Sequence, residues 1–214
     1  MSKVIVILGA GAGISQSVAR TFGKQGFSIA LVSRNIEKLS AFIAELSQEN
    51  IRAKAFSADV CNEAAVKNVV KEIKDTFGRI DIVHYNAAAV RMVNILSESA
   101  ESLIQDFSVN VAGLLTVTLL TMAELEANKG AILITGGGFA MYPSADFASL
   151  SIGKAGVRNL SESLSQALKD KGIYVATLTV NGYVSPDSAV HNPDNIAFHF
   201  WKLYNERNKF EIQL

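Results

Sequence analysis

The chain has 214 residues, of which 49% are hydrophobic and 19% charged, and its twenty basic and twenty acidic side chains cancel. This length and composition are typical of one soluble globular domain, 1–214, and are short for two. The sequence contains no basic run that could follow a phosphate backbone, so we expect no nucleic-acid partner. The single cysteine, Cys61, cannot form an internal disulfide, which favours a reducing compartment and a cytoplasmic location.

Short β-rich apolar runs alternate with longer helical patterns along the whole chain. The strands are expected at 3–8, 28–32, 51–55, 81–84, 131–135, 174–179 and 210–214, and the helices at 14–24, 36–48, 63–77, 101–128, 149–171 and 195–205. The strands are continuously apolar, which is typical of a sheet buried on both faces. Because strands and helices alternate, right-handed crossovers and parallel strands are expected. The sequence therefore predicts an α/β fold, a Rossmann-type doubly wound parallel sheet of about seven strands with helices on both faces.

Two apolar segments resemble export or membrane signals. Residues 1–12 combine a lysine, an apolar run and small residues, but the run continues into an amphipathic helix, so we interpret it as a buried first strand. Residues 109–123 are apolar over about fifteen positions, below the roughly 20 that span a bilayer. We interpret this second segment as a buried helix and expect no membrane partner.

A glycine-rich turn joins the first expected strand to the first helix. It carries Gly9, Gly11, Ala12, Gly13 and Ile14. Glycines permit a tight turn in which backbone N–H groups approach a pyrophosphate, whose charge is favoured at the helix N-terminus. The third glycine comes one residue earlier than in the common Gly-x-Gly-x-x-Gly pattern, but the strand-to-helix context is that of a dinucleotide site. We predict that these residues bind a cofactor; the alternative is a tight turn with no ligand.

The end of the second strand carries Ser33 and Arg34, about 20 residues after the glycine turn. An acidic residue there accepts a hydrogen bond from the ribose 2′-hydroxyl of NAD, whereas an arginine pairs with the 2′-phosphate of NADP. The sequence therefore predicts a site that favours NADP(H) over NAD(H). The alternative is that Arg34 is a solvated surface residue.

Further motifs follow in an order and spacing that resemble those of the short-chain dehydrogenase/reductase family over nearly the whole chain. In that family the glycine loop is Thr-Gly-x-x-x-Gly-Ile-Gly, which Gly9 and Gly13 match. The resemblance implies an oxidoreductase that acts on a carbonyl or an alcohol with a nicotinamide cofactor. It also implies cofactor contacts for Asp59 and Val60, for Asn86 and Ala87, and, near the nicotinamide, for the pair Asn181 and Gly182.

The resemblance breaks at residues that carry the family's chemistry. Lys154 matches the lysine of the family's Tyr-x-x-x-Lys motif, and Asn110 matches the asparagine of its proton-relay tetrad. Leu150 stands at the tyrosine position, and the glycine run 136–138 stands where the serine is expected. Asn110 and Lys154 are therefore the retained catalytic positions, and Lys154 is expected to hold the nicotinamide ribose. Tyr183, on the loop after the sixth strand, is a weaker candidate for the missing proton donor.

Two hypotheses for function follow. The first is an NADP(H)-dependent oxidoreductase that acts on a small-molecule carbonyl or alcohol with degenerate catalytic residues. The second is a non-catalytic nucleotide-binding protein that acts as a sensor or as a subunit of an assembly. The three histidines show no metal-like spacing, so we expect no metal site. The apolar helices 101–128 and 149–171 correspond to those through which the family forms dimers and tetramers, so they are candidates for a homodimer or homotetramer contact, although their apolar residues could face only the sheet.

Overall fold

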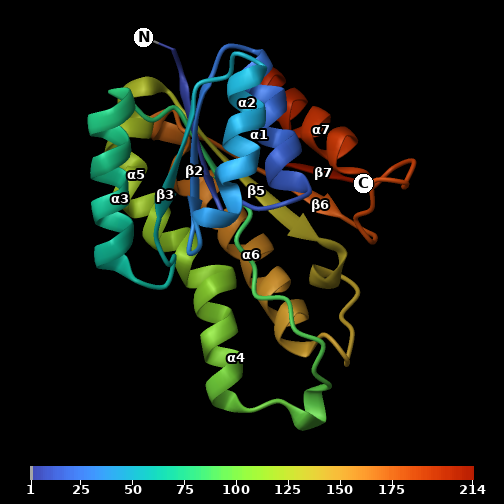
Figure 1. Cartoon of the computed structure of the whole chain (residues 1–214). Helices are drawn as coiled ribbons and strands as arrows, with labels where there is room; N and C mark the ends of the chain where they lie inside the picture. The colour runs from blue at the N-terminus through green and yellow to red at the C-terminus, as the bar shows by residue number, and fades with distance from the viewer. Residues whose placement is uncertain (1) are drawn as a thin grey trace.

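Seven parallel strands form one sheet in the computed structural model, which describes residues 2–214 (Figure 1). The strands are β1 Val4–Leu8, β2 Ser28–Ser33, β3 Ala53–Ser57, β4 Ile82–Tyr85, β5 Ala131–Gly137, β6 Tyr174–Val180 and β7 Glu211–Gln213. Their order across the sheet is β3-β2-β1-β4-β5-β6-β7, so it reverses between β1 and β4. This doubly wound α/β arrangement confirms the fold predicted from the alternation of strands and helices.

Helices cover both faces of the sheet, which explains why its five inner strands are almost wholly buried, whereas the edge strands β3 and β7 are partly exposed. The helices are α1 Ile14–Lys24, α2 Ser40–Gln48, α3 Glu63–Phe77, α4 Ala100–Phe107, α5 Gly113–Asn128, α6 Ala148–Ala167 and α7 Pro193–Glu206. On one face α3, α5 and α6 share a core with strand residues such as Val6. On the other face α1, α2 and α7 pack around Ile7 and Phe22. Adjacent residues of one strand, Val6 and Ile7, thus enter opposite cores.

The third strand, β3, begins two residues after the start of the predicted run 51–55. Ile51 is apolar because it is buried in the turn that precedes the strand. Its backbone N–H donates to Leu46 O at 2.8 Å just beyond α2. Its side chain packs against Gly23 of α1, where an added Cβ would lie 2.5 Å from Ile51 Cγ2. Burial in a turn and burial in a strand leave the same apolar signature in a sequence. Two helix ends also differ, because 36–48 begins with the 3₁₀ turn Glu37–Leu39 and 149–171 ends with the 3₁₀ turn Lys169–Lys171.

The helix predicted at 101–128 contains a π-helical turn, Ser108–Ala112, between α4 and α5. A buried tyrosine of β4 reaches this turn, where Tyr85 Oη donates to the backbone carbonyl of Val109 at 2.5 Å. Gly113 makes room for the hydroxyl, because a Cβ there would overlap Tyr85 Oη. A side chain that enters the helical ladder is a common cause of such irregular turns. Burial raises the pKa of the Tyr85 hydroxyl, which therefore remains a donor.

The combined helical segment Ala100–Asn128 is long and apolar enough to cross a membrane. In the fold, its inner side belongs to the core beneath the sheet, where Leu114, Val117 and Leu125 are buried. Its outer side exposes Leu115 and Leu119. The α5 part of the segment is therefore in the helical layer that covers the sheet, the place expected for a buried apolar helix, whereas α4 extends beyond the sheet and contacts α6 (Figure 1).

Acid should destabilise this fold through His84 of β4. The ring is fully buried, and desolvation lowers the pKa of His84 from 6.5 to about 3. Below pH 6.5 the unfolded chain binds a proton at His84 that the folded chain does not bind, so the free energy of unfolding falls by up to about 1.4 kcal/mol per pH unit. Urea unfolding of the wild type and of His84→Gln, from about pH 7 to about pH 5, measures this term. The wild type should lose stability more steeply with acid, and equal slopes would contradict the prediction.

Candidate functional site

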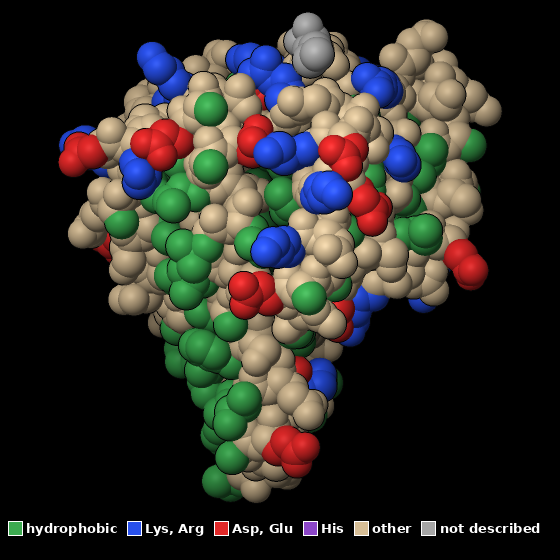
Figure 2. All heavy atoms as spheres, turned by 90° about the vertical axis from the view of Figure 1, so that its left-hand side faces the viewer, with side chains coloured by type: hydrophobic (Ala, Val, Ile, Leu, Met, Phe, Trp, Pro, Cys, Tyr) green, Lys and Arg blue, Asp and Glu red, His purple; other side chains and the backbone are tan. Residues whose placement is uncertain are grey.

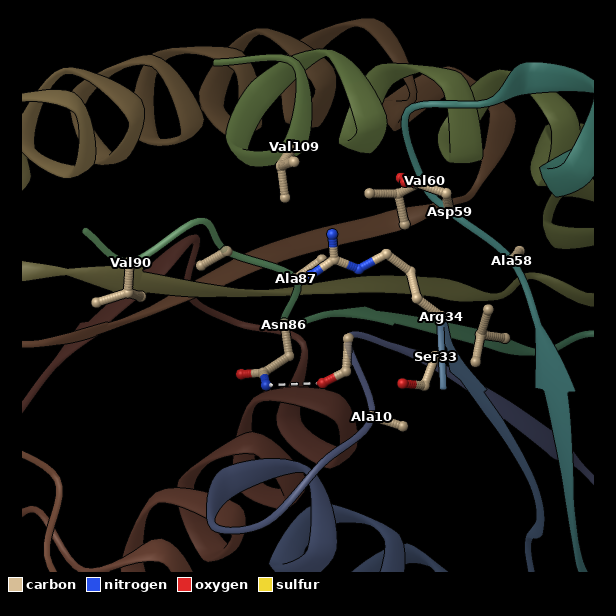
Figure 3. Close-up of a pocket in the computed structure, with 13 residues that line it drawn as sticks. Ala10, Ser33, Arg34, Ala58, Asp59, Val60, Asn86, Ala87, Val90 and Val109 are labelled. Atoms are coloured by element: carbon tan, nitrogen blue, oxygen red, sulfur yellow. Dashed lines mark hydrogen bonds between the residues drawn. The ribbon is translucent and has the colours of Figure 1, made fainter. Parts of the chain in front are cut away.

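A cleft of about 330 Å³ lies at the carboxyl ends of β1, β2 and β4 (Figure 3). The strand order reverses here, and ligands of doubly wound sheets bind at this point. Its lining comprises Gly9, Ala10, Val32, Ser33, Arg34, Ala58, Asp59, Val60, Asn86, Ala87, Ala88, Val90 and Val109. Of the residues predicted to bind the cofactor, Gly11, Ala12, Ile14 and Lys154 lie outside this lining, and Gly13 lines a neighbouring hollow between α1 and α7.

The glycine turn offers free backbone donors at the start of α1. Gly13, with φ 83°, precedes the helix, and no side chain of the described residues caps it. Three other helices do have side-chain caps, since Asn62 caps α3, Ser99 caps α4 and Asn192 caps α7. An added Cβ at Gly11 would meet no heavy atom of the described chain within 4 Å. Uncapped N–H groups, the helix dipole and open space together fit a phosphate group at this end of α1.

Gly9 closes the turn against the segment that follows β4. Its φ of 76° lies in the left-handed region, and a Cβ there would lie 2.5 Å from both Cα and N of Ala87. The backbone N–H groups of Gly9 and Ala10 both donate to Val32 O, at 3.1 and 3.0 Å. The turn is therefore attached to β2 and pressed against the end of β4, and only glycine fits at this position.

Arg34 brings a positive charge into the cleft. Figure 3 shows its side chain extending from the end of β2 across the cleft toward Ala87 and Val109. None of the salt bridges within residues 2–214 involves Arg34. Beyond the end of β3, Asp59 Oδ1 accepts from the backbone N–H of Cys61 at 2.9 Å, which holds the turn that forms this wall. An unpaired guanidinium at the end of β2 fits the 2′-phosphate of NADP.

Asn86 uses its side chain within the protein. Its Nδ2 donates to Ser15 Oγ at 2.8 Å and to Gly9 O at 3.4 Å, the latter drawn as a dashed line in Figure 3. Its Oδ1 accepts from Thr135 Oγ1 at 2.8 Å. Asn86 is among the residues predicted from the sequence to contact the cofactor, whereas its partners Thr135 and Ser15 are not. A threonine at the end of an apolar strand carries no signal of its own, because the strand pattern tolerates it.

The positions that should carry the chemistry meet between β5 and α6. Lys154 Nζ donates to the backbone carbonyl of Thr135 at 2.8 Å, and desolvation lowers the pKa of this amine to about 8. A Cβ at Gly137 would lie 3.3 Å from Lys154 Cε, so these two positions face each other. Leu150, one turn before Lys154 on α6, exposes only 7% of its surface. Neither Leu150 nor Gly137 offers an exchangeable side-chain proton at this place.

Asn110 lies in the π turn and connects three elements. Its Oδ1 accepts from the backbone N–H of Ala89 at 2.8 Å, and its Nδ2 has no partner within the described residues. An added Cβ at Gly153 of α6 would lie 2.5 Å from Asn110 Nδ2, so α6 approaches the π turn closely here. Asn110 thus ties the segment after β4 to the turn that packs on α6.

Tyr183 is not held at this site. It exposes 88% of its surface on the loop after β6, and Tyr142 exposes 74%. Further along the same loop His191 packs against Gly182, where an added Cβ would lie 2.3 Å from its ring. Within residues 2–214 no three His, Cys, Asp or Glu side chains form a group that could hold a metal ion.

Comparison with known proteins gives related sequences. The family described as short chain dehydrogenase matches residues 3–195 of the chain. The 2,3-dihydro-2,3-dihydroxybenzoate dehydrogenase of Bacillus subtilis (strain 168) is 33% identical over 172 residues. The matched region makes up 80% of this chain and 66% of that protein, just under two thirds of its length.

Solved structures share the fold over almost the whole chain. A metagenomic short-chain oxidoreductase in complex with NADP has a TM-score of 0.89 at 22% identity, covering 99% of this chain and 96% of that one. An alcohol dehydrogenase from the archaeon Thermococcus sibiricus, complexed with 5-hydroxy-NADP, has a TM-score of 0.87 at 22% identity, covering 99% and 95%. At these identities the likeness concerns the fold.

Proposed function

The chain belongs to the short chain dehydrogenase family, and on that premise we propose that it binds NADP(H) at the carboxyl ends of β1, β2 and β4. When bound, NADPH would supply the hydride for reduction of a small-molecule carbonyl, and NADP⁺ would accept a hydride in oxidation of the corresponding alcohol. The observation that carries the proposal is the uncapped glycine turn of α1 beside the unpaired guanidinium of Arg34. Together they provide donors for a diphosphate and a cation for a 2′-phosphate.

Each chemical group of NADP(H) has a counterpart among the residues of the candidate site. The amides of the glycine turn suit the diphosphate, the end of β2 suits the 2′-phosphate, and the wall after β3 suits the adenine. The amine of α6 suits the nicotinamide ribose. We assign the cofactor to Gly9, Gly11, Ala12, Gly13, Ile14, Ser33, Arg34, Asp59, Val60, Asn86, Ala87 and Lys154.

The proton that accompanies hydride transfer lacks the family's donor. Leu150 and Gly137 replace the hydroxyl-bearing residues, while Lys154 keeps an amine whose pKa desolvation lowers to about 8. General acid catalysis contributes roughly 10²- to 10⁴-fold to such reactions. We therefore expect NADP(H) to bind and turnover to be slow, with the proton taken from water or from Lys154.

A second candidate function is nucleotide binding without catalysis, as a sensor or as a subunit of an assembly. The burial of Leu150 favours it, because a packed apolar side chain fills the place of a proton donor. Titration with NADPH followed by a screen of carbonyl compounds separates the two. Slow turnover supports the first function, binding without turnover supports the second, and turnover at about 1 to 10³ s⁻¹ contradicts the loss of the acid. Absence of binding at millimolar NADPH contradicts both.

Replacing Arg34 by alanine should weaken NADPH binding about ten- to hundredfold and leave NADH binding unchanged. The reason is that a hydrogen bond to a charged group contributes about 1.5–3 kcal/mol, and only NADPH carries the 2′-phosphate. Fluorescence titrations with both cofactors measure the preference. Lys38→Ala is the matched control, because it removes a nearby exposed charge that is not part of the cleft. An equal loss for both cofactors would mean that Arg34 does not recognise the 2′-phosphate.

Exposed apolar side chains of α4 and α5 are the proposed contact between copies of the chain. Figure 2 shows hydrophobic side chains gathered in a column on this side of the protein. Ile104, Phe107, Leu115 and Leu119 are the exposed members on these two helices. Apolar surface of this kind marks interaction sites, and members of the family associate as dimers and tetramers. A homodimer or homotetramer would cover it.

This contact predicts that Leu115→Glu shifts the chain from an oligomer to a monomer. Burying a carboxylate in an apolar interface is strongly unfavourable. Sedimentation velocity measures the change. Ile36→Glu is the control, because Ile36 and Leu115 are both 40% exposed and Ile36 precedes α2, which packs on the other face. A wild-type chain that sediments as a monomer would contradict the proposed contact.

A further inference from the structure

A chain of hydrogen bonds runs beneath the cleft from β4 to the glycine turn. His84 Nε2 lies 3.1 Å from Thr135 Oγ1, and Thr135 Oγ1 donates to Asn86 Oδ1 at 2.8 Å. Asn86 Nδ2 donates to Ser15 Oγ at 2.8 Å, and Ser15 Oγ donates to Gly9 O at 3.0 Å. Side chains of β4, β5 and α1 are thus connected to the first glycine of the turn.

The partners along this hydrogen-bond chain fix the position of each of its protons. An amide oxygen only accepts, so the hydroxyl proton of Thr135 belongs to the bond with Asn86 Oδ1. Thr135 Oγ1 must then accept from His84, which places the imidazole proton on Nε2. A backbone carbonyl also only accepts, so Gly9 O requires the amide nitrogen of Asn86 on its side. Every donor therefore points toward the glycine turn, and bonds aligned in this way polarise one another.

The histidine end of the chain is held by the core. His84 is fully buried, its Nδ1 has no partner within the described residues, and its ring lies 4.6 Å from that of Phe200 on α7. Desolvation keeps the imidazole neutral at ordinary pH, with a pKa lowered to about 3. A neutral ring with one proton and one hydrogen-bond partner has a single orientation, so the donor toward Thr135 is fixed.

Thr135 is connected by hydrogen bonds to both ends of the proposed cofactor site. Its hydroxyl reaches the glycine turn through Asn86, and its backbone carbonyl accepts from Lys154 Nζ at 2.8 Å. Two donors hold Gly9 O inside the protein, and the N–H groups of Gly11, Ala12 and Gly13, which have no acceptor within the described residues, stay available to an anion. We propose that His84 and Thr135 are positioning residues of the nucleotide site, which hold the glycine turn in its binding geometry through Asn86 and Ser15. This inference rests on the proposed NADP(H) binding, and neither residue lines the cleft.

Thr135→Val tests the proposal, because it removes the hydroxyl and keeps the backbone carbonyl and the shape. The dissociation constant for NADPH should rise about three- to tenfold. Amide hydrogen exchange at residues 9–13 should become faster in the protein without nucleotide. Thr135→Ser restores the hydroxyl and should recover both values. Thr177→Val is the matched control, since Thr177 lies on the neighbouring strand β6 and its buried hydroxyl has no partner within the described residues.

The outcomes separate a positioning role from a structural one. If Thr135→Val loses stability but keeps the wild-type affinity and exchange, or if the serine variant fails to recover them, the inference is overturned. If the valine variant does not fold, Ser15→Ala breaks the last bond of the chain and is measured in the same way. Nitrogen chemical shifts of His84 in the wild type give an independent check, because a proton on Nδ1 would contradict the chain. If the wild type does not bind NADPH, the proposed function fails, while exchange and tautomer still decide whether the chain holds the turn.

Discussion

Carbonyl reduction with NADPH is expected to rise roughly 10²- to 10⁴-fold when Leu150 is replaced by tyrosine and Gly137 by serine in one protein. Leu150 lies one helical turn before Lys154, and a Cβ at Gly137 would point at Lys154 Cε from 3.3 Å. The new tyrosine would sit beside a cation that lowers its pKa and would donate the proton, and the new serine would hold the substrate oxygen. The measurement is kcat/KM for a small aldehyde at saturating NADPH.

The same pair of positions offers a control without hydroxyls. Leu150→Phe with Gly137→Ala adds equivalent bulk but no proton donor, so it should stay at the wild-type rate. The contact of 3.3 Å at Gly137 involves the flexible chain of Lys154, which can shift by the few tenths of an ångström that a Cβ requires. An equal gain in kcat/KM for the control would show that the added bulk, and not the hydroxyl groups, raises the activity. No gain in the hydroxyl variant, with NADPH still bound, would show that the nicotinamide lies elsewhere.

Replacing Gly9 by alanine should lower the free energy of unfolding by about 2–5 kcal/mol. The left-handed φ of 76° contributes about 1–2 kcal/mol of this loss. The overlap of the new Cβ with the backbone of Ala87, 2.5 Å away, contributes about 1–3 kcal/mol. Backbone atoms cannot move aside as a side-chain end can, so the turn itself must open. Urea unfolding measures the loss, and NADPH binding should disappear with it.

Gly11 gives the contrasting result within the same turn. A Cβ there meets no heavy atom of the described chain within 4 Å, and its φ lies outside the left-handed region, so Gly11→Ala should change stability by less than about 0.5 kcal/mol. It should nevertheless weaken NADPH binding by about tenfold or more, because the methyl group occupies space that a diphosphate needs beside the backbone. Unchanged affinity in a stable Gly11→Ala protein would place the phosphates away from this turn.

Much of the architecture was predictable because it depends on local patterns. The inner strands of a parallel sheet covered on both faces are apolar throughout, which marks them without knowledge of their neighbours, whereas the edge strand β3 was placed two residues early. The candidate cleft was also foreseeable, since Gly9, Arg34 and Asp59 each follow the end of a strand. Parallel strands end at one edge of the sheet, so these residues had to lie near one another. The prediction that the family's acid is missing also rests on a local pattern, since Leu150 stands one helical turn before Lys154.

Contacts between segments that are far apart in the chain leave no local pattern in the sequence. His84 pairs with Leu133 in the register of β4 and β5, and this register brings Thr135, two residues further on, to the imidazole. The π turn likewise depends on Tyr85 reaching Val109 across the gap between a strand and a helix. In the sequence these polar residues only interrupt apolar runs.

The amino-acid sequence alone determined the order of the elements and the edge of the sheet that bears the cleft, because hydrophobic periodicity, glycine turns and charged residues are patterns of a few neighbouring residues. The tertiary structure alone decided which buried polar atoms meet, namely the hydrogen-bond chain from His84 to Gly9 and the place of Lys154 on Thr135. Hydrogen bonds require partners within about 3 Å, and only the packed register of strands and helices sets such distances.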